Sequence, residues 1–163
     1  MNKTNYINGS DLLLKVAGKP VGHCTTHTTT YNSETKDRAV KPVATQGVSA
    51  GLWKNKGVTG LSVSISFEGL RFYGETEGGF KTLLNKWKKG EPVDVEGFER
   101  EKDQTPYLSG KFIFASLEEG APAGDDATYS GSLENDGEVT IAEDNLTGEA
   151  IASAEQGENV TNP

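Results

Sequence analysis

The chain has 163 residues, of which 16 are Lys or Arg and 24 are Asp or Glu, giving a formal net charge of −8. This acidic balance argues against tight binding to duplex DNA or to an anionic membrane, because both attract clusters of Lys and Arg. The length favours one domain, and 20 glycines, well above the usual share of about 7%, favour frequent turns and an all-β architecture.

The charges are unevenly distributed along the chain. All 16 basic residues lie within residues 1–111 with 12 of the acids, a balance of +4. Residues 112–163 carry the other 12 acids and no base, a balance of −12, of which −7 falls on 112–141 and −5 on 142–163. The second part is therefore expected to supply acidic surface.

The N-terminal region has no targeting pattern. Residues 1–9 are polar and are expected to form an arm, and the apolar run Leu12–Leu14 is too short for a signal sequence. No stretch is long and apolar enough for a transmembrane helix. A single cysteine, Cys24, excludes an internal disulfide and a cysteine zinc site. We expect a protein made inside the cell.

Two strands are predicted between residues 11 and 31. The first covers 11–17 and ends at the turn Gly18-Lys19-Pro20, because proline cannot continue a central ladder. The second, 21–31, contains five threonines, which favour strands. Strand periodicity places His23 and His27 on one face, about 13 Å apart at ~3.3 Å per residue, and Cys24 on the other. That distance excludes a shared metal ion, so these residues are interpreted as partly buried strand residues.

Residues 32–56 show no periodicity and are predicted to be a long connection containing a lone Trp53. Connections longer than about 12–15 residues are usually functional, or become ordered only with a partner. Trp53 is expected to be buried, either against its own subunit or against another.

The next two elements have the clearest periodicity. Leu61, Val63, Ile65 and Phe67 alternate with polar residues, which predicts a strand with one face on the core. A helix is predicted over 75–89, with Gly90 as its C-terminal cap. Its apolar stripe is interpreted as core, with an exposed assembly surface as the alternative; the stripe consists of Phe80, Leu83, Leu84 and Trp87.

Three further strands are predicted in the last third of the chain: 92–98, a central strand at 107–118, and 127–133. Asn135-Asp136-Gly137 then indicates a hairpin turn into Val139 and Ile141. From residue 142 the pattern stops, and we expect 142–163 to be a disordered, solvated acidic tail that assembly tolerates losing.

The sequence contains no pattern typical of catalysis or of cofactor binding. Phosphate-binding, dinucleotide-binding, serine hydrolase and zinc protease motifs are all missing. Asp125-Asp126 and Asn135-Asp136-Gly137 lack the ligand spacing of a calcium loop and are interpreted as turns. We predict a protein that is not an enzyme and needs no metal or cofactor.

Several separated stretches resemble the major tail proteins, or tail tube proteins, of phages with long non-contractile tails. The stretches, in chain order, are Val21-Gly22-His23 before the threonine-rich strand, Ser33–Asp37, Val63–Leu70, Leu83–Val93 and Asp125–Leu133. Each is weak alone, but together they span residues 10–141, the whole predicted domain. The acidic segment 143–163 is longer than the family core requires.

The resemblance implies a β-sandwich or partly rolled barrel with one flanking helix, six copies in a ring, and rings stacked into the hollow tube of a virion tail. It also implies kinship with the tube protein of type VI secretion. Its implied partners are further copies of the chain and the tape-measure, tail-terminator and distal tail proteins. DNA would pass through the lumen without being bound, and no membrane would be involved.

Two sets of residues follow from the resemblance. The loop that orders on ring stacking corresponds to the predicted connection, and deleting residues 40–54 should leave a folded domain that forms no tubes; its candidates are Thr35, Lys36, Asp37, Arg38, Lys41, Trp53, Lys54 and Lys56. The candidates for a wall that repels phosphate in the lumen are Glu118, Glu134, Asp136 and Glu138. The rival interpretation is a monomeric β-sandwich that binds carbohydrate or a particle surface through Trp53.

Overall fold

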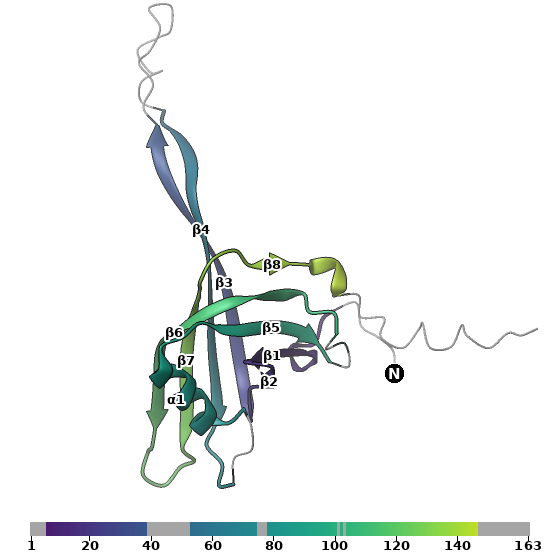
Figure 1. Cartoon of the computed structure of the whole chain (residues 1–163), viewed down its shortest axis with the longest axis vertical. Helices are drawn as coiled ribbons and strands as arrows, with labels where there is room; N and C mark the ends of the chain where they lie inside the picture. Colours follow the sequence, from purple (N-terminus) through teal and green to yellow (C-terminus); the bar gives the residue numbers. More distant parts are fainter. Residues whose placement is uncertain (1–5, 39–52, 75–77, 101, 103, 147–163) are drawn as a thin grey trace, which may run out of the picture.

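The computed structural model describes residues 6–38, 53–74, 78–100, 102 and 104–146. Eight strands join one antiparallel sheet, and one helix covers its flank (Figure 1). This confirms the predicted mainly β fold with a flanking helix. Within the described residues, no helix has the length and apolar character needed to cross a bilayer.

The sheet runs in the order β2-β1-β5-β6-β7-β4-β3, and β8 pairs with β6. The strands are β1 (Leu12–Val16), β2 (Lys19–Pro20), β3 (Cys24–Arg38), β4 (Asn55–Leu70), β5 (Val93–Glu99), β6 (Leu108–Gly120), β7 (Thr128–Asn135) and β8 (Thr140–Ile141). The helix is α1 (Phe80–Lys89), and 3₁₀ turns occupy η1 (Gly9–Asp11) and η3 (Glu143–Asn145).

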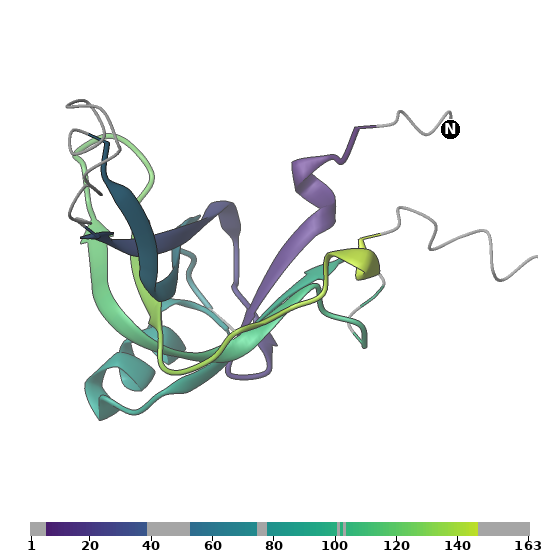
Figure 2. The ribbon, with the colours of Figure 1, turned by 90° about the horizontal axis from the view of Figure 1, so that it is seen from above.

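The sheet bends at β6 into two halves. Residues 108–112 of β6 pair with β5, whereas residues 112–120 pair with β7. We call the layer formed by β3, β4, β7 and residues 113–120 of β6 the four-stranded half. Seen from above, the two halves diverge and the sheet stays open rather than closing into a barrel (Figure 2).

The core lies between the two halves. The predicted alternation in β4 is confirmed for Val63, Ile65 and Phe67, which are buried, whereas Leu61 is 78% exposed because it lies beyond the core. The Tyr129 ring contacts Phe67 and the helix residue Phe80, with ring centres 6.3 and 5.8 Å apart, and its hydroxyl donates to the carbonyl of Gly22. These contacts connect β7 with β4, α1 and the residues just before β3.

Truncating a core residue of β4 tests this packing. Ile65→Ala should lower the free energy of unfolding by about 2–5 kcal/mol, because Ile65 is fully buried and its loss leaves a cavity. Leu61→Ala on the same strand is the matched control and should change stability by less than about 0.5 kcal/mol. Chemical denaturation measures both variants, and equal losses would contradict the assignment of the core.

The predicted connection over 32–56 is wrong at both ends. Strand β3 continues to Arg38 and β4 begins at Asn55, and the two pair directly along this stretch. Both strands leave the body here as a two-stranded ribbon (Figure 1). Such a ribbon has no buried face, so its side chains lack the alternation that identifies strands in a sequence.

The hairpin turn predicted at Asn135-Asp136-Gly137 is also wrong. Strand β8 pairs with β6, not with β7, and continues along the same side of β6 that β7 occupies. The amide of Asp136 donates to the carbonyl of Lys111, and Gly137 has a φ of 89°. The motif therefore forms a kink between β7 and β8, because pairing with β6 keeps the chain running in one direction.

The helix begins later than predicted. Phe80 is its first residue, Gly79 is its N-cap, and the predicted Glu75 and Glu77 lie outside the described residues. Gly90 caps the C-terminus in the left-handed conformation, as predicted. Gly78, with φ 96°, passes so close to the carbonyl of Pro20 that a side chain would clash there.

The helix stripe is only half core. Phe80 and Leu83 are buried, but Leu84 is 41% and Trp87 48% exposed. The four residues follow helical spacing, yet the single chain supplies packing partners only for the first pair. Leu84 and Trp87 are therefore not core residues of the single chain, and a role for them in assembly stays a prediction.

Three smaller differences concern strand ends. The predicted turn Gly18-Lys19-Pro20 contributes a short strand, because Lys19 and Pro20 pair with β1 at the sheet edge. His23 has a φ of 51° and precedes β3, and the register shifts between Cys24 and Thr26, so the predicted common face from residue 21 to 31 is interrupted. Residues 142–146 continue past the predicted domain end, with Leu146 packed against the core.

Candidate functional site

The outward face of the four-stranded half is made of hydroxyl and carboxylate side chains. Ser64 and Ser66 of β4 lie between buried residues and point away from the core, and Ser62 continues the same face of the strand. The strand register aligns polar residues of β3, β7 and β6 with them. We call this surface the polar wall; it consists of Thr26, Thr28, Thr30, Asn32, Glu34, Ser62, Ser64, Ser66, Glu68, Ser116, Glu118, Ser130, Ser132 and Glu134.

Hydrogen bonds connect neighbouring strands across the polar wall. The Ser116 and Ser132 hydroxyls are 2.8 Å apart, and Ser130 donates to the Glu118 carboxylate at 3.3 Å. A shallow groove of about 310 Å³ runs over this part of the surface. The strand segments 26–34, 60–70, 113–120 and 128–135 contain no Lys or Arg, so the polar wall is acidic.

Two of the four predicted lumen residues lie on the polar wall. Glu118 and Glu134 are on it, whereas Asp136 and Glu138 follow the end of β7 and line a separate groove with Lys111. Lys111 pairs with Asp94 at 3.1 Å in that groove. Sequence reasoning missed Glu34 and Glu68. The alternation of serine with apolar residues before Glu68 was the available signal for the latter.

The four-stranded half has an unpaired edge on each side. Strand β3 is the last strand of the sheet order. On the other side, the pairing of β6 with β5 ends at Phe112, so residues 113–120 have no strand beyond them among the residues that the structure describes. Each edge presents backbone N–H and C=O groups that can pair with another strand.

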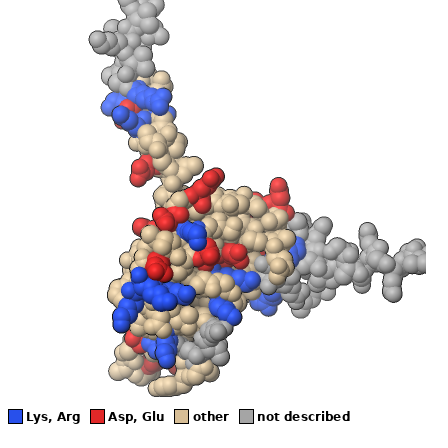
Figure 3. All heavy atoms as spheres, viewed as in Figure 1, with Lys and Arg blue, Asp and Glu red and all other residues tan. Residues whose placement is uncertain are grey.

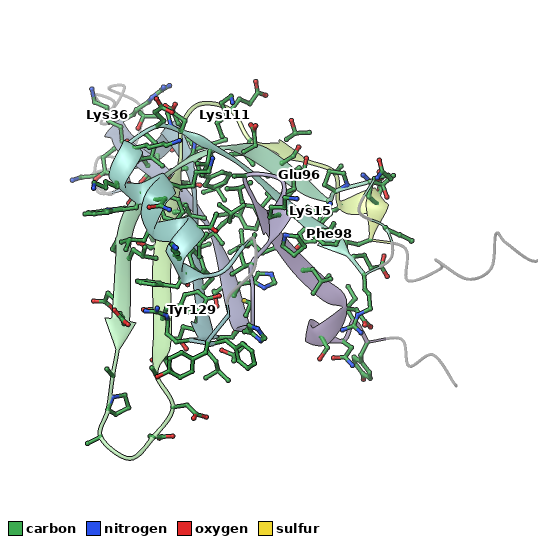
Figure 4. The ribbon with its side chains drawn as sticks, turned by 60° about the horizontal axis from the view of Figure 1, so that its bottom comes forward. Lys15, Lys36, Glu96, Phe98, Lys111 and Tyr129 are labelled. Carbon is green, nitrogen blue, oxygen red and sulfur yellow. The ribbon has the colours of Figure 1, made fainter. Side chains whose placement is uncertain are left out.

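A basic ribbon projects from one end of the body. We call residues 34–38 and 54–60 the arm; within it, Lys36 pairs with Gly57 and Arg38 with Asn55 in the strand register. The Asp37 carboxylate oxygens lie 3.9 Å from Nζ of Lys54 and 4.0 Å from Nζ of Lys56. Lys and Arg gather near its far end (Figure 3), and Lys36 lies far from Tyr129 and the core (Figure 4).

Most of the predicted loop residues therefore lie on paired strands of the arm or next to them. Thr35, Lys36, Asp37 and Arg38 belong to β3, and Lys56 belongs to β4. Trp53, just before β4, is 85% exposed, so burial within its own chain is wrong. Lys41 lies outside the described residues.

His23 and Cys24, two further residues with reactive or metal-binding side chains, both have structural surroundings. His23 stacks on Phe72 with ring centres 4.6 Å apart, and Cys24 is half-buried. Burial raises the pKa of the Cys24 thiol, outweighing backbone hydrogen bonds that lower it, so the thiol is protonated at neutral pH. No cluster of three or more His, Cys, Asp or Glu side chains suited to a metal ion occurs in the described part of the chain.

His27 makes stability depend on pH. Burial lowers its pKa below the usual 6.5, so the unfolded chain takes up a proton at higher pH than the folded chain does. Stability should therefore fall as pH drops below 6.5 and stop falling below the lowered pKa. His27→Gln should remove this part of the decline, measured by denaturation from about pH 7.5 to 5. An unchanged slope in His27→Gln, relative to a Thr28→Ser control, would contradict the role of His27.

Comparisons with known proteins agree with this architecture. The sequence model of a family described as phage tail tube protein matches residues 6–141. No curated protein sequence matches the chain.

Three solved structures share the fold. A chain from the virion of a native gene transfer agent particle has a TM-score of 0.66 and 19% identity, covering 83% of this chain and 98% of that chain. A chain from the tail of an empty gene transfer agent particle, refined with C6 symmetry, has a TM-score of 0.65 and 19% identity, covering 83% of this chain and 98% of that chain. The SPP1 tail tube, solved by solid-state NMR and cryo-EM, has a TM-score of 0.59 and 16% identity, covering 97% of this chain and 92% of that chain.

The family match covers far more than half of the sequence and includes every strand of the sheet. The similar chains come from a virion, a tail and a tail tube, and the match covers 92–98% of their length. The chain therefore belongs to the phage tail tube protein family, whose members are structural proteins rather than enzymes.

Proposed function

We propose that six copies of this chain form a ring by pairing the free edge of β3 with residues 113–120 of β6 in the next copy. The observation that carries this proposal is the position of the two unpaired edges on opposite sides of one four-stranded half. Such a contact joins different surfaces of identical copies, so it repeats until the ring closes. Six-fold closure is the symmetry of the similar gene transfer agent tail.

In this ring the polar wall lines the lumen. Six copies with four strands each give a wall of 24 strands. With about 4.8 Å between strands and a tilt of roughly 40°, the backbone diameter is about 48 Å, wide enough for a DNA duplex. The wall offers phosphates no cation, so DNA passes without being held.

Stacking of rings builds the hollow tube, and the arm is the element that reaches the next ring. The arm leaves the body at one end of β4, and the β6–β7 connection, with Asp125 and Asp126, lies at the other end. A basic end and an acidic end attract each other when rings stack head to tail. The finished tube forms the virion tail with the tape-measure, tail-terminator and distal tail proteins as partners.

Electron microscopy of purified protein tests this function. We expect rings or tubes, with light scattering that rises with protein concentration. Monomers alone under all salt and concentration conditions, with or without the tape-measure protein, would contradict the tube. Binding of the monomer to a glycan array would instead support the rival carbohydrate-binding module.

A further inference from the structure

The flank of the molecule beside the β6 edge carries an apolar and basic surface on helix α1. Leu84, Trp87 and Ile113 are 41%, 48% and 40% exposed. Lysines 86 and 88 line a groove of about 370 Å³ together with Trp87 and Ile113. We call the surface formed by Leu84, Lys86, Trp87, Lys88, Lys89 and Ile113 the helix face.

The helix face is positively charged, with three lysines against one carboxylate, Glu91, in the same groove. Lys86, Lys88 and Lys89 all lie in the last turn of α1, where positive charge also favours the helix dipole. None of the three forms an ion pair with a carboxylate in the described part of the chain. An occupant of this surface should therefore be acidic, with some apolar side chains to cover Trp87.

The segment 147–163 of the same sequence has this chemistry. It contains three glutamates, Glu149, Glu155 and Glu158, and no Lys or Arg. It also contains Ile151 and Val160 among small residues. The charge and the apolar content of this segment complement those of the helix face.

The position of Leu146 decides which copy the segment meets. Residues just before it are fixed to the body, because the Asn145 side chain donates to the carbonyl of Pro106 at 3.0 Å and the amide of Ala142 donates to the carbonyl of Tyr107 at 2.8 Å. Tyr31 of β3 is in register with the buried Val63, so its side chain lies on the core-facing side of that edge strand. The nearby Glu143 carboxylate adds to burial in raising the pKa of the Tyr31 hydroxyl. The segment therefore leaves the body at the start of β6, on the side that the core-facing side of β3 also faces.

The helix face lies beside the opposite edge. It shares its groove with Ile113 and Phe114, where the free edge of β6 begins. Within one copy, η3 and α1 lie on separate sides of the molecule (Figure 2). The proposed ring joins these two edges, so it brings the Leu146 of one copy toward the helix face of its neighbour. Seventeen residues reach up to about 60 Å, so length is not limiting.

We propose that residues 147–163 of one copy bind the helix face of the neighbouring copy in the ring. This inference rests on the proposed ring. The contact adds a second, salt-sensitive link beside the strand pairing, so removing the segment should leave tubes that dissociate at lower salt concentration. The sequence alone predicts an expendable tail; the proposed contact would give this tail a binding role in the ring.

The fluorescence of Trp87 tests whether the segment covers the helix face, without relying on the salt stability of the tubes. In a Trp53→Phe background, Trp87 is the only tryptophan. Its emission should shift to shorter wavelength when the full chain assembles, and should not shift when a variant ending at Leu146 assembles. That shorter variant keeps every strand and both sheet halves, so its fold is preserved. Identical shifts in both variants would overturn the proposal.

Cysteine crosslinking identifies the copies involved. In a Cys24→Ser background, chains with Lys88→Cys are mixed with chains carrying Glu155→Cys before assembly and then oxidised. We expect disulfide-linked dimers containing one chain of each kind, and at least tenfold fewer when Lys56→Cys on the arm replaces Lys88→Cys. Tubes that form without these dimers would overturn the inference alone, whereas failure of the unmodified chain to form any ring or tube would overturn the proposed function.

Discussion

Replacing residues 39–54 by the dipeptide Asn-Gly is expected to leave the domain folded and to abolish tube growth. Arg38 and Asn55 are direct partners in the β3–β4 register, so a two-residue turn can connect them. The buried residues of β4 begin at Val63, well away from the change. Loop-closure entropy changes by about 0.6 kcal/mol per doubling of length, so stability should shift by no more than about 2 kcal/mol.

The loss of tube growth follows from the position of the arm. It projects beyond the body (Figure 1), so its tip can reach a stacked neighbour, whereas the ring edges lie in the body. Thermal unfolding followed by circular dichroism reports the fold, and electron microscopy with light scattering reports assembly. We expect single rings or monomers at concentrations where the unmodified chain forms tubes.

A same-length control separates reach from sequence. Replacing residues 39–52 by a glycine-serine stretch keeps Trp53 and Lys54 and the number of residues between Arg38 and Trp53. If this control grows tubes, length and Trp53 suffice; if it does not, the side chains of 39–52 are required. Intact tubes from the Asn-Gly variant would remove residues 39–54 from the stacking mechanism.

Sequence patterns predicted the elements that contact the core. The alternation through Val63, Ile65 and Phe67 located β4, because one of its faces is buried. The outer part of the same strand was missed, since a two-stranded ribbon buries neither face. The Asn135-Asp136-Gly137 kink was read as a hairpin because turn chemistry is local, whereas the pairing of β8 with β6 is not.

The polar wall could be predicted only in part, because its residues are brought together by pairing between distant strands. Glu118 and Glu134 were found because the acidic charge gathers after Lys111. Glu68 was not, because its position beside Ser130 and Glu118 depends on the register of three strands. Leu84 and Trp87 were assigned to the core because helical spacing shows an apolar stripe but not whether one chain or two cover it.

The second large effect is expected from reversing the charge of the polar wall. A triple variant with Glu68→Lys, Glu118→Lys and Glu134→Lys should still fold, because exposed substitutions change stability by about 0.5 kcal/mol or less each. Its tubes should hold DNA that the unmodified tube lets pass. Three lysines per copy, repeated around the ring and along the tube, give phosphates a continuous set of cation partners.

Co-sedimentation of tubes with linear DNA over a salt series measures this effect. Binding by the triple variant should fall by about 10³-fold or more between 50 and 200 mM salt, as expected when six or more phosphates are neutralised together. The unmodified tubes should retain no DNA at either concentration. Phage carrying the variant should eject DNA more slowly.

A control with the same change in net charge distinguishes the wall from charge in general. Asp94→Lys, Glu96→Lys and Glu138→Lys place three lysines around the groove that contains Lys111, away from the polar wall. Because this groove does not face the lumen in the proposed ring, the control tubes should bind DNA only on their outer surface, where nuclease digests it. DNA inside the triple-variant tubes should resist the nuclease. Equal nuclease sensitivity of the two would mean that the polar wall does not line the lumen.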